Sequence, residues 1–302
     1  MKKLSVIISA FNEERKIEDC LKSAKFADEI VFVNNSSTDQ TRKIAEKYTE
    51  TIIDQKNDPN RIDRQKNAGI EKATNEWVFI LDADERITEE LAREIKQTIN
   101  SETKFSGFRI PRKNIAFGKW IQHTGWYPDY QLRLFKKGKG RFSQDYVHQV
   151  LEVDGEIGLL ENDLFHQNYE SINQFLNRAV NLYTPNEAEK KIAQGYEFSF
   201  SDAIKLPFNE FLKRFFKEKG FKDGFHGLIL AILMAFYHFM VFAYIWEKQK
   251  FKETDESMLN LAKDEFKNMV RETNYWIDTE KIEQHKNPIS KSLLKVKRKL
   301  SK

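Results

Sequence analysis

Three acidic residues within four positions, Asp82, Asp84 and Glu85, are the most informative feature of the sequence. They directly follow an apolar run, Trp77 to Leu81. Crowded carboxylates raise one another's pKa unless a cation or hydrogen-bond donors compensate them. Mg²⁺ and Mn²⁺ prefer oxygen ligands, and such ions usually bind one or two carboxylates together with substrate phosphates. The segment therefore predicts a divalent-metal site, with a solvated turn before a helix as the alternative.

The segments around these acids alternate between apolar runs and helical spacing. Apolar runs at 4–9, 29–33, 51–54 and 77–81 alternate with helical patterns at 14–25, 41–48, 63–73 and 89–100. This alternation predicts an open α/β sheet with its ligand site at the carboxyl ends of the strands. Residues 77–81 are apolar on both faces, as expected of a central strand covered by helices. The acids are therefore expected at the ligand-binding edge.

The pattern changes twice further along the chain. Residues 105–165 form short alternating pieces separated by glycine turns, which predicts antiparallel strands added to the sheet. After about residue 169 the sequence reads as helical. We therefore expect a sheet domain at residues 1–166 and a helical region at residues 167–302.

Composition narrows the class of protein. The 50 Lys and Arg against 46 Asp and Glu leave a net charge of +4, which does not indicate a nucleic-acid binder. The single cysteine, Cys20, excludes an internal disulfide and a site of several thiolates, which favours a reducing compartment. The first apolar run ends at Phe11, too early for a signal peptide. We expect a cytoplasmic enzyme.

Three linked motifs carry a family resemblance. They are Val6–Glu14 (VIISAFNEE), Val33–Thr41 (VNNSSTDQT), and Lys66-Asn67 followed by Ile80–Glu85 (ILDADE). In order and spacing they resemble the family-2 glycosyltransferases, which have the GT-A nucleotide-sugar-binding fold: a mixed sheet flanked by helices. The resemblance covers residues 1–166.

The resemblance implies a role for each matching residue. The base and ribose would be lined by Ala10, Asn12 and Glu13, and the nucleoside would be contacted by Asn34 and Asp39. Lys66 would contact a phosphate or the ribose. Asp82 would contact the ribose or a metal-bound water, and Asp84 would bind an Mg²⁺ or Mn²⁺ ion between the phosphates. Asn12 and Asp39 could instead cap helices. The family usually has Asp at the position of Asn34, where the carboxylate accepts a hydrogen bond from uracil. Asn also accepts, but it brings a donor. Uracil is therefore the expected base.

Sugar transfer with inversion also needs a base that takes the proton of the acceptor hydroxyl. Asp129, in the segment Gly125–Asp129 (GWYPD), is the candidate, with aromatic neighbours that could stack on a sugar. The segment resembles that of lipopolysaccharide-core glucosyltransferase-like members, although a Pro-Asp turn is the alternative. Arg133 would reach the diphosphate or face water. His148 would add an imidazole ligand to the metal, with His123 and His166 as weaker alternatives.

Residues 227–246 contain no Asp, Glu, Lys or Arg. As a helix they would extend about 30 Å, enough to cross a bilayer core. Basic residues flank both ends, however, and a span would place one basic cluster outside, against the positive-inside tendency. We therefore expect an in-plane or re-entrant helix, helped by the basic tail 291–302 on an anionic surface. A buried core helix is the alternative.

Together these features predict an inverting, metal-dependent glycosyltransferase of lipopolysaccharide biosynthesis. It would move a hexose from a nucleotide-sugar donor, UDP-linked, to a cell-envelope glycan or glycolipid acceptor. The expected location is the inner face of the plasma membrane, as a peripheral or monotopic protein. One alternative is a nucleotidyltransferase, which would need a glycine-rich and basic phosphate loop that residues 10–14 lack. Another is a non-catalytic membrane scaffold. It is suggested by Asn34, where the family usually has Asp, and by Gln149, where the family often has Glu.

Overall fold

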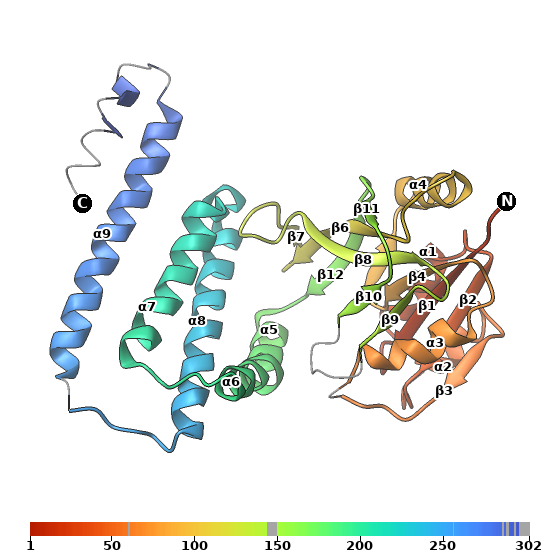
Figure 1. The fold of residues 1–302 in the computed structure, drawn as a ribbon, viewed down its shortest axis with the longest axis horizontal. Coiled ribbons are helices and arrows are strands. Elements are labelled where there is room, and N and C mark those ends of the chain that lie inside the picture. Colours follow the sequence, from red (N-terminus) through yellow and green to blue (C-terminus); the bar gives the residue numbers. More distant parts are fainter. Residues whose placement is uncertain are drawn as a thin grey trace. The chain divides into compact units, whose positions relative to one another are not determined.

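The computed structural model describes residues 1–59, 61–143, 150–255 and 257–285, together with 287, 290–292, 294 and 295. The chain forms two compact units (Figure 1). The first comprises Met1–Ala116 and Tyr127–Asn168, and the second comprises Phe117–Trp126 and Tyr169–Lys302. The break after Asn168 lies two residues beyond the end of the predicted sheet domain. The short segment Phe117–Trp126 groups with the helices.

The first half of the first unit alternates strands and helices. Its elements are β1 (Leu4–Ala10), α1 (Ile17–Ser23), β2 (Glu29–Asn34), α2 (Thr41–Ala45), β3 (Ile52–Asp54), a 3₁₀ turn (Arg64–Lys66), α3 (Asn67–Lys72) and β4 (Trp77–Asp82). Strand β1 pairs in parallel with β2 and β4, and β2 with β3. The register sets Asn34 opposite both Ala10 and Asp54, and Asp82 opposite Ser9. The polar strand ends thus meet at one edge of the sheet, as predicted.

The second half of this unit extends the sheet. Its elements are β5 (Glu85–Ile87), α4 (Glu89–Asn100), β6 (Gly107–Ala116), β8 (Asp129–Lys136), β9 (Gly140–Phe142), β10 (Leu151–Val153), β11 (Ile157–Leu159) and β12 (Leu164–Tyr169). The strand order is β3-β2-β1-β4-β8-β6-β12-β5. Strand β8 is antiparallel to β4 and β6, and β12 is antiparallel to β5. Strand β11, expected to be antiparallel, runs parallel to β6. Strands β9 and β10 form a separate antiparallel pair.

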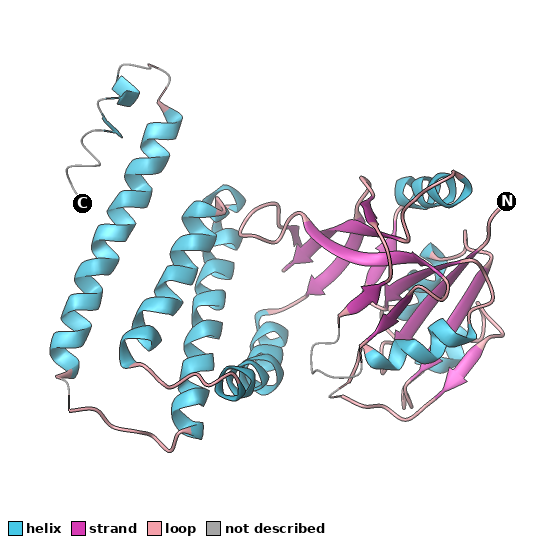
Figure 2. Cartoon of the chain, viewed as in Figure 1, coloured by secondary structure: helices cyan, strands magenta, loops and turns pink. Residues whose placement is uncertain are grey.

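Helices cover both faces of the parallel strands, as Figure 2 shows. Val6 and Ile8 of β1 face a buried cluster that includes side chains of α1, α2 and α4, whereas Ile7 faces a second cluster with α3. Strand β4 is buried on both faces, as its sequence predicts. Gly69 lets α3 approach β1 closely, because a Cβ there would collide with Ile7. The mixed sheet with flanking helices confirms the expected GT-A arrangement.

Among the described residues of the second unit, the regular elements are helices and one short strand, β7 (Lys119–Trp120). Its helices are α5 (Ile172–Arg178), α6 (Thr184–Ala193), α7 (Phe200–Leu212), α8 (Phe225–Lys248) and α9 (Met258–Gln284), with π-helical turns at Ala179–Tyr183 and Lys213–Lys217 and a 3₁₀ turn at Gly220–Asp223. By length and composition, α8 could cross a membrane, and 28% of its most apolar stretch is buried within the protein. Tyr237 and Tyr244 of α8 donate hydrogen bonds to Glu187 and to the carbonyl of Val180.

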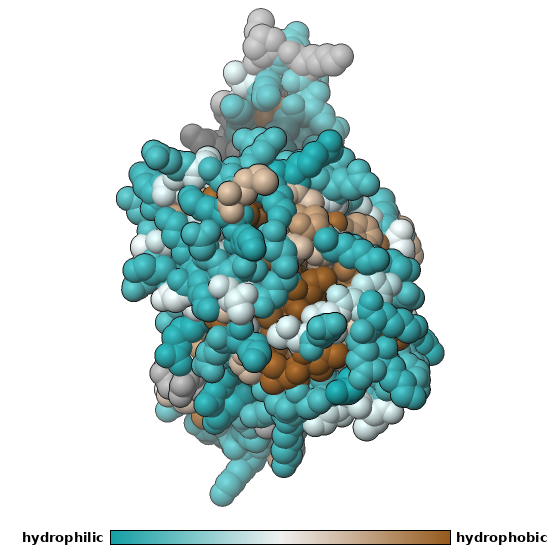
Figure 3. All heavy atoms as spheres, turned by 90° about the vertical axis from the view of Figure 1, so that its right-hand side faces the viewer, coloured by the Kyte–Doolittle hydropathy of each residue, from teal (hydrophilic) through white to brown (hydrophobic). Residues whose placement is uncertain are grey.

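Figure 3 shows one face of the molecule. Most of its surface is hydrophilic, and an apolar area lies near its centre. Scattered apolar surface is ordinary for a folded protein, so this area alone indicates no function.

Candidate active site

Asp82, the last residue of β4, is compensated by two buried cations. Lys66 Nζ lies 2.6 Å from Asp82 Oδ1, and Arg133 Nη2 lies 2.6 Å from Asp82 Oδ2. Burial would raise the pKa of Asp82, but the charges of Arg133 and Lys66 outweigh it and hold the pKa well below its usual range. Lys66 also pairs with Asp63 at 2.8 Å. Arg133 does not face water, because only 6% of its surface is exposed.

Glu85 is the innermost of the three acids and is fully buried. Its Oε1 accepts a hydrogen bond from Arg133 Nη2 at 2.6 Å, and its Oε2 accepts from the backbone N–H of Asp82 at 3.0 Å. Arg112 lies 3.4 Å from Oε1. Glu85 begins strand β5, a strand that the sequence reading missed. It therefore anchors the turn through these internal partners.

Asp129 begins strand β8 opposite Arg112 of β6. Arg112 donates two hydrogen bonds to Asp129 Oδ2, from Nε at 2.9 Å and Nη2 at 2.5 Å. Gln131 donates to Oδ1 at 2.7 Å, and Asn114 donates to Oδ2 at 3.3 Å. Burial would raise the pKa of Asp129, but Arg112 and the two amides lower it overall. The carboxylate is therefore ionised at neutral pH and fixed in direction, while its side chain keeps 27% exposure.

A short polar chain leads from Asp129 to Asp84. The side-chain N–H of Asn114 faces Asp129, so its oxygen faces His166 Nδ1 at 2.6 Å. An amide oxygen only accepts, so His166 Nδ1 donates this hydrogen bond. His166 Nε2 then faces Asp84 Oδ2 at 3.6 Å. Burial would raise the pKa of Asp84, but His166 outweighs it and lowers the pKa.

Asp84 and His166 suit a divalent cation. A histidine that ligates a metal through one nitrogen normally donates its other N–H to an oxygen, as His166 does to Asn114. Asp82 is less suited, because both of its oxygens are paired with cations. Among the described residues, no group of three His, Cys, Asp or Glu side chains could hold a metal. An ion here would need further ligands from phosphate or water. His148, the predicted imidazole ligand, lies outside the described residues.

Two loops at the ends of β1 and β2 brace each other. Asn12, with a positive φ of 54°, accepts a hydrogen bond from the N–H of Thr38 at 2.8 Å. Asp39 accepts from the N–H of Glu14 at 3.1 Å. The residues at the N-cap positions of α1 and α2 are Lys16 and Gln40. Asn12 therefore shapes the loops. Asp39 does the same and also accepts from the N–H of Thr41, the first residue of α2, at 2.9 Å, as in the helix-capping alternative.

The other predicted nucleotide-binding residues lie at the same edge. The carbonyl of Ala10 accepts from the N–H of Asn35 at 3.0 Å, and the N–H of Glu13 donates to Thr41 Oγ1 at 2.7 Å. Asn34 is buried and donates its amide N–H to Asp54 at 2.7 Å.

The structure brings five predicted residues into one network: Lys66, Asp82, Asp84, Asp129 and Arg133. Sequence reasoning missed Arg112 and Asn114, and it ranked His166 below His148. Arg112 and Asn114 lie two residues apart on β6, which places both on one face of the strand. That two-residue spacing of Arg112 and Asn114 was the available signal.

His123, the other weak candidate, has a structural role in the second unit. Its N–H donates to buried Asp223 at 2.8 Å, and its Nδ1 lies 3.1 Å from the same carboxylate. Lys119 donates to the carbonyl of Asp223 at 2.7 Å. These contacts fasten the segment Phe117–Trp126 to the helices.

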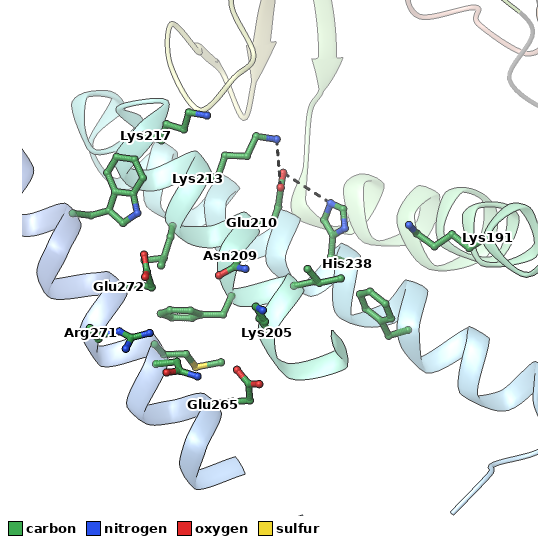
Figure 4. A pocket seen from close by; sticks show the side chains of 17 residues that line it. Lys191, Lys205, Asn209, Glu210, Lys213, Lys217, His238, Glu265, Arg271 and Glu272 are labelled. Atoms are coloured by element: carbon green, nitrogen blue, oxygen red, sulfur yellow. Dashed lines mark hydrogen bonds and ion pairs between the residues drawn. The ribbon is translucent and has the colours of Figure 1, made fainter. Parts of the chain in front are cut away.

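The helical unit has a cavity of about 680 Å³ among α7, α8 and α9 (Figure 4). It is lined by both signs of charge, with Glu210 paired to Lys213 at 3.5 Å and to His238 at 3.9 Å. None of the predicted site residues lines it. The strand-end network of the first unit is therefore the candidate active site.

Replacing Arg133 by Met should destabilise the protein by about 3–5 kcal/mol, because buried Glu85 would lose its close cation. Urea unfolding of the purified protein would measure the loss. Arg93→Met is the matched control. Arg93 is exposed and pairs with Glu90 at 3.5 Å, and such surface pairs contribute about 0–1 kcal/mol. Equal effects of the two substitutions would contradict a structural role for the buried cluster.

The chain is similar to known glycosyltransferases. The sequence profile of glycosyl transferase family 2 matches residues 5–150. An uncharacterized glycosyltransferase of Rickettsia typhi, RT0209, is 31% identical over 82% of this chain and 88% of that protein. The lipopolysaccharide core biosynthesis glycosyltransferase LpsC of Rhizobium meliloti is 27% identical over 82% of this chain and 94% of that protein. The structure of S. aureus TarS 1–349 in complex with UDP matches with 14% identity and a TM-score of 0.41, over 85% of this chain and 94% of that one.

The sequence matches and the mixed-sheet fold define a glycosyltransferase. The chain belongs to glycosyl transferase family 2.

Proposed function

We propose that this glycosyltransferase transfers a hexose with inversion from a UDP-linked donor to a lipopolysaccharide-core or related envelope acceptor. One observation carries the proposal: the chain Asp84–His166–Asn114–Asp129 joins the candidate metal acid to the candidate base. A donor diphosphate at Asp84 and an acceptor hydroxyl at Asp129 would thus be held by one connected set of side chains. The name of LpsC supports the class of acceptor.

Asp129 would act as the base. It is ionised at neutral pH, because Arg112 lowers its pKa, and so it can accept the proton of the attacking hydroxyl. Arg112 weakens it as a base but fixes its direction, and positioning lowers the barrier as well. Inversion follows when the hydroxyl attacks the anomeric carbon opposite the leaving diphosphate.

Asp84 and His166 would hold Mg²⁺ or Mn²⁺, which would neutralise charge on the leaving diphosphate. Lys66 and Arg133 already neutralise Asp82, so the protein adds little net negative charge near that diphosphate. Asn12, Glu13, Asn34 and Asp39 would surround the nucleoside, on the loops that brace each other.

The direct test is donor binding and hydrolysis by the purified protein. Saturation-transfer NMR with a panel of nucleotide sugars, with and without Mn²⁺, should show binding of a UDP-sugar, and slow release of UDP should depend on the ion. Absence of binding across the panel would favour the alternative of a non-catalytic scaffold. The nucleotidyltransferase alternative is removed by the family membership.

We also propose that the helical unit lies on the cytoplasmic face of the membrane. Helix α8 exposes Phe225, Ile232, Phe236 and Phe239. Helix α9 exposes Leu259, Phe266, Val270 and Ile277, whose spacings of 7, 4 and 7 put them on one helix face. Exposed apolar residues on two consecutive helices suit the interfacial region of a bilayer.

If α8 lies in the interface, the chain after it stays on the cytoplasmic side. A Glu253→Cys variant carries a thiol just after α8, at an exposed position. An impermeant maleimide should leave it unlabelled in intact cells and label it after lysis. Asp19→Cys, at an exposed position of α1, is the control for the cytoplasmic side, and native Cys20 is fully buried. Labelling of the position-253 thiol in intact cells would establish a span and contradict the interfacial model.

A further inference from the structure

Asn34 stands where the family usually has a carboxylate. The N–H and the oxygen of its side-chain amide have different partners. Its Nδ2 donates to Asp54 Oδ1 at 2.7 Å, and its Oδ1 accepts from the N–H of Ser37 at 3.1 Å. An ionised carboxylate only accepts and a backbone N–H only donates. The flipped amide would set oxygen against carboxylate and N–H against N–H. The direction of the Asn34 amide is therefore fixed by its neighbours.

Asp54 is itself held in place. Arg42 donates to Asp54 from Nε at 3.0 Å to Oδ1 and from Nη2 at 3.2 Å to Oδ2. The hydrogen bonds from Arg42 and Asn34 lower the pKa of Asp54, so it is ionised at neutral pH. The strand register places Asp54 directly opposite Asn34. A carboxylate is thus present at this edge of the sheet, but it belongs to Asp54 on β3 and not to residue 34 on β2.

We propose that Asp54, held by Arg42, is a positioning residue that makes Asn34 present its amide oxygen to the nucleobase. This inference rests on the proposed function, in which Asn34 faces the base of a nucleoside diphosphate. Uracil carries an N–H at ring position 3, which an amide oxygen can accept. Cytosine carries an acceptor there, which the same oxygen would repel. Asn34 and Asp54 together would therefore select uracil over cytosine, as a single carboxylate would.

The physical basis is the cost of an unmatched polar pair. An unrestrained Asn can offer either its oxygen or its N–H to a ligand, and so discriminates poorly between the two pyrimidines. A buried amide held by an ionised partner cannot turn without losing a hydrogen bond to a charged group, which costs more than a neutral one. Selectivity would arise from that restraint.

Asp54→Ala removes the restraint and should reduce the ratio of CDP to UDP dissociation constants by about tenfold, mainly through tighter CDP binding. Isothermal titration of both nucleotides would measure it. Glu46→Ala is the matched control, because Glu46 pairs with the same Arg42 and has no hydrogen bond to Asn34. The control should keep the wild-type ratio. An unchanged ratio in folded Asp54→Ala would overturn the proposal.

A charge exchange gives a second test. Asn34→Asp alone places two carboxylates against each other and should weaken UDP binding by at least about tenfold. Adding Asp54→Asn supplies a donor to the new carboxylate and should restore UDP binding. Failure of the double variant to recover would overturn the proposal, even if Asp54→Ala does not fold.

The outcomes separate the inference from the proposed function. Wild-type protein that binds neither UDP nor CDP, or binds both equally, contradicts uridine as the donor nucleoside. A wild-type preference for UDP that survives Asp54→Ala contradicts only the role of Asp54.

Discussion

Asp84→Ala should lower sugar transfer by more than about 100-fold, since even residues that only support a metal ligand typically contribute 10–100-fold. The fold should survive, because the turn is held by the backbone bond from Gln167 N–H to the Asp84 carbonyl, which the substitution keeps. Titration of Mn²⁺ in the presence of UDP should show loss of ion binding. This readout does not depend on catalysis.

Two further variants sharpen the metal test. Asp19→Ala removes an exposed acid on α1 and should leave transfer and Mn²⁺ binding unchanged. His166→Ala should weaken Mn²⁺ binding as Asp84→Ala does, because the two side chains face each other at 3.6 Å. Transfer by Asp84→Ala within a few-fold of wild type would remove Asp84 from the metal site. Normal Mn²⁺ binding by His166→Ala would leave that role to a residue such as His148.

The local sequence is sufficient to predict features that depend on residues close together in the chain. Strand β4 follows from an apolar run that is buried on both faces, and α4 begins after Thr88, whose hydroxyl accepts the N–H of Leu91 at 3.1 Å. The sequence also predicts that the polar residues after successive strands lie together, because the carboxyl ends of parallel strands meet at one edge of the sheet. These rules located Asp82 and Asp84 before any contact was known.

The rest of the site depends on pairings between distant segments. Arg112 meets Asp129 because β6 and β8 pair in one particular register, and β5 forms because β12 lies beside it. Neither register can be deduced from a single sequence. The sequence shows that Asn114 is polar, but its two hydrogen-bond partners, Asp129 and His166, come from different strands. The choice of His166 over other histidines follows only from those partners.

Asp129→Asn should keep donor binding and lower the transfer rate by at least about 100-fold, the lower range for loss of a general base. The amide preserves the shape of the side chain but cannot take the proton. Its oxygen can still accept from Arg112, so the pairing of β6 with β8 should remain. Steady-state kinetics with saturating donor would give the rate, and UDP titration would give donor affinity.

The control is Asp28→Asn, since Asp28 also pairs with a cation, Lys96 at 3.0 Å, but lies at the start of β2, away from the strand ends that carry the site. It should transfer sugar at the wild-type rate. If Asp129→Asn loses rate only in proportion to weaker UDP binding, Asp129 positions the donor and is not the base. Glu85 could not replace it, because it is fully buried and both of its carboxylate oxygens accept hydrogen bonds. The base would then have to come from outside this network.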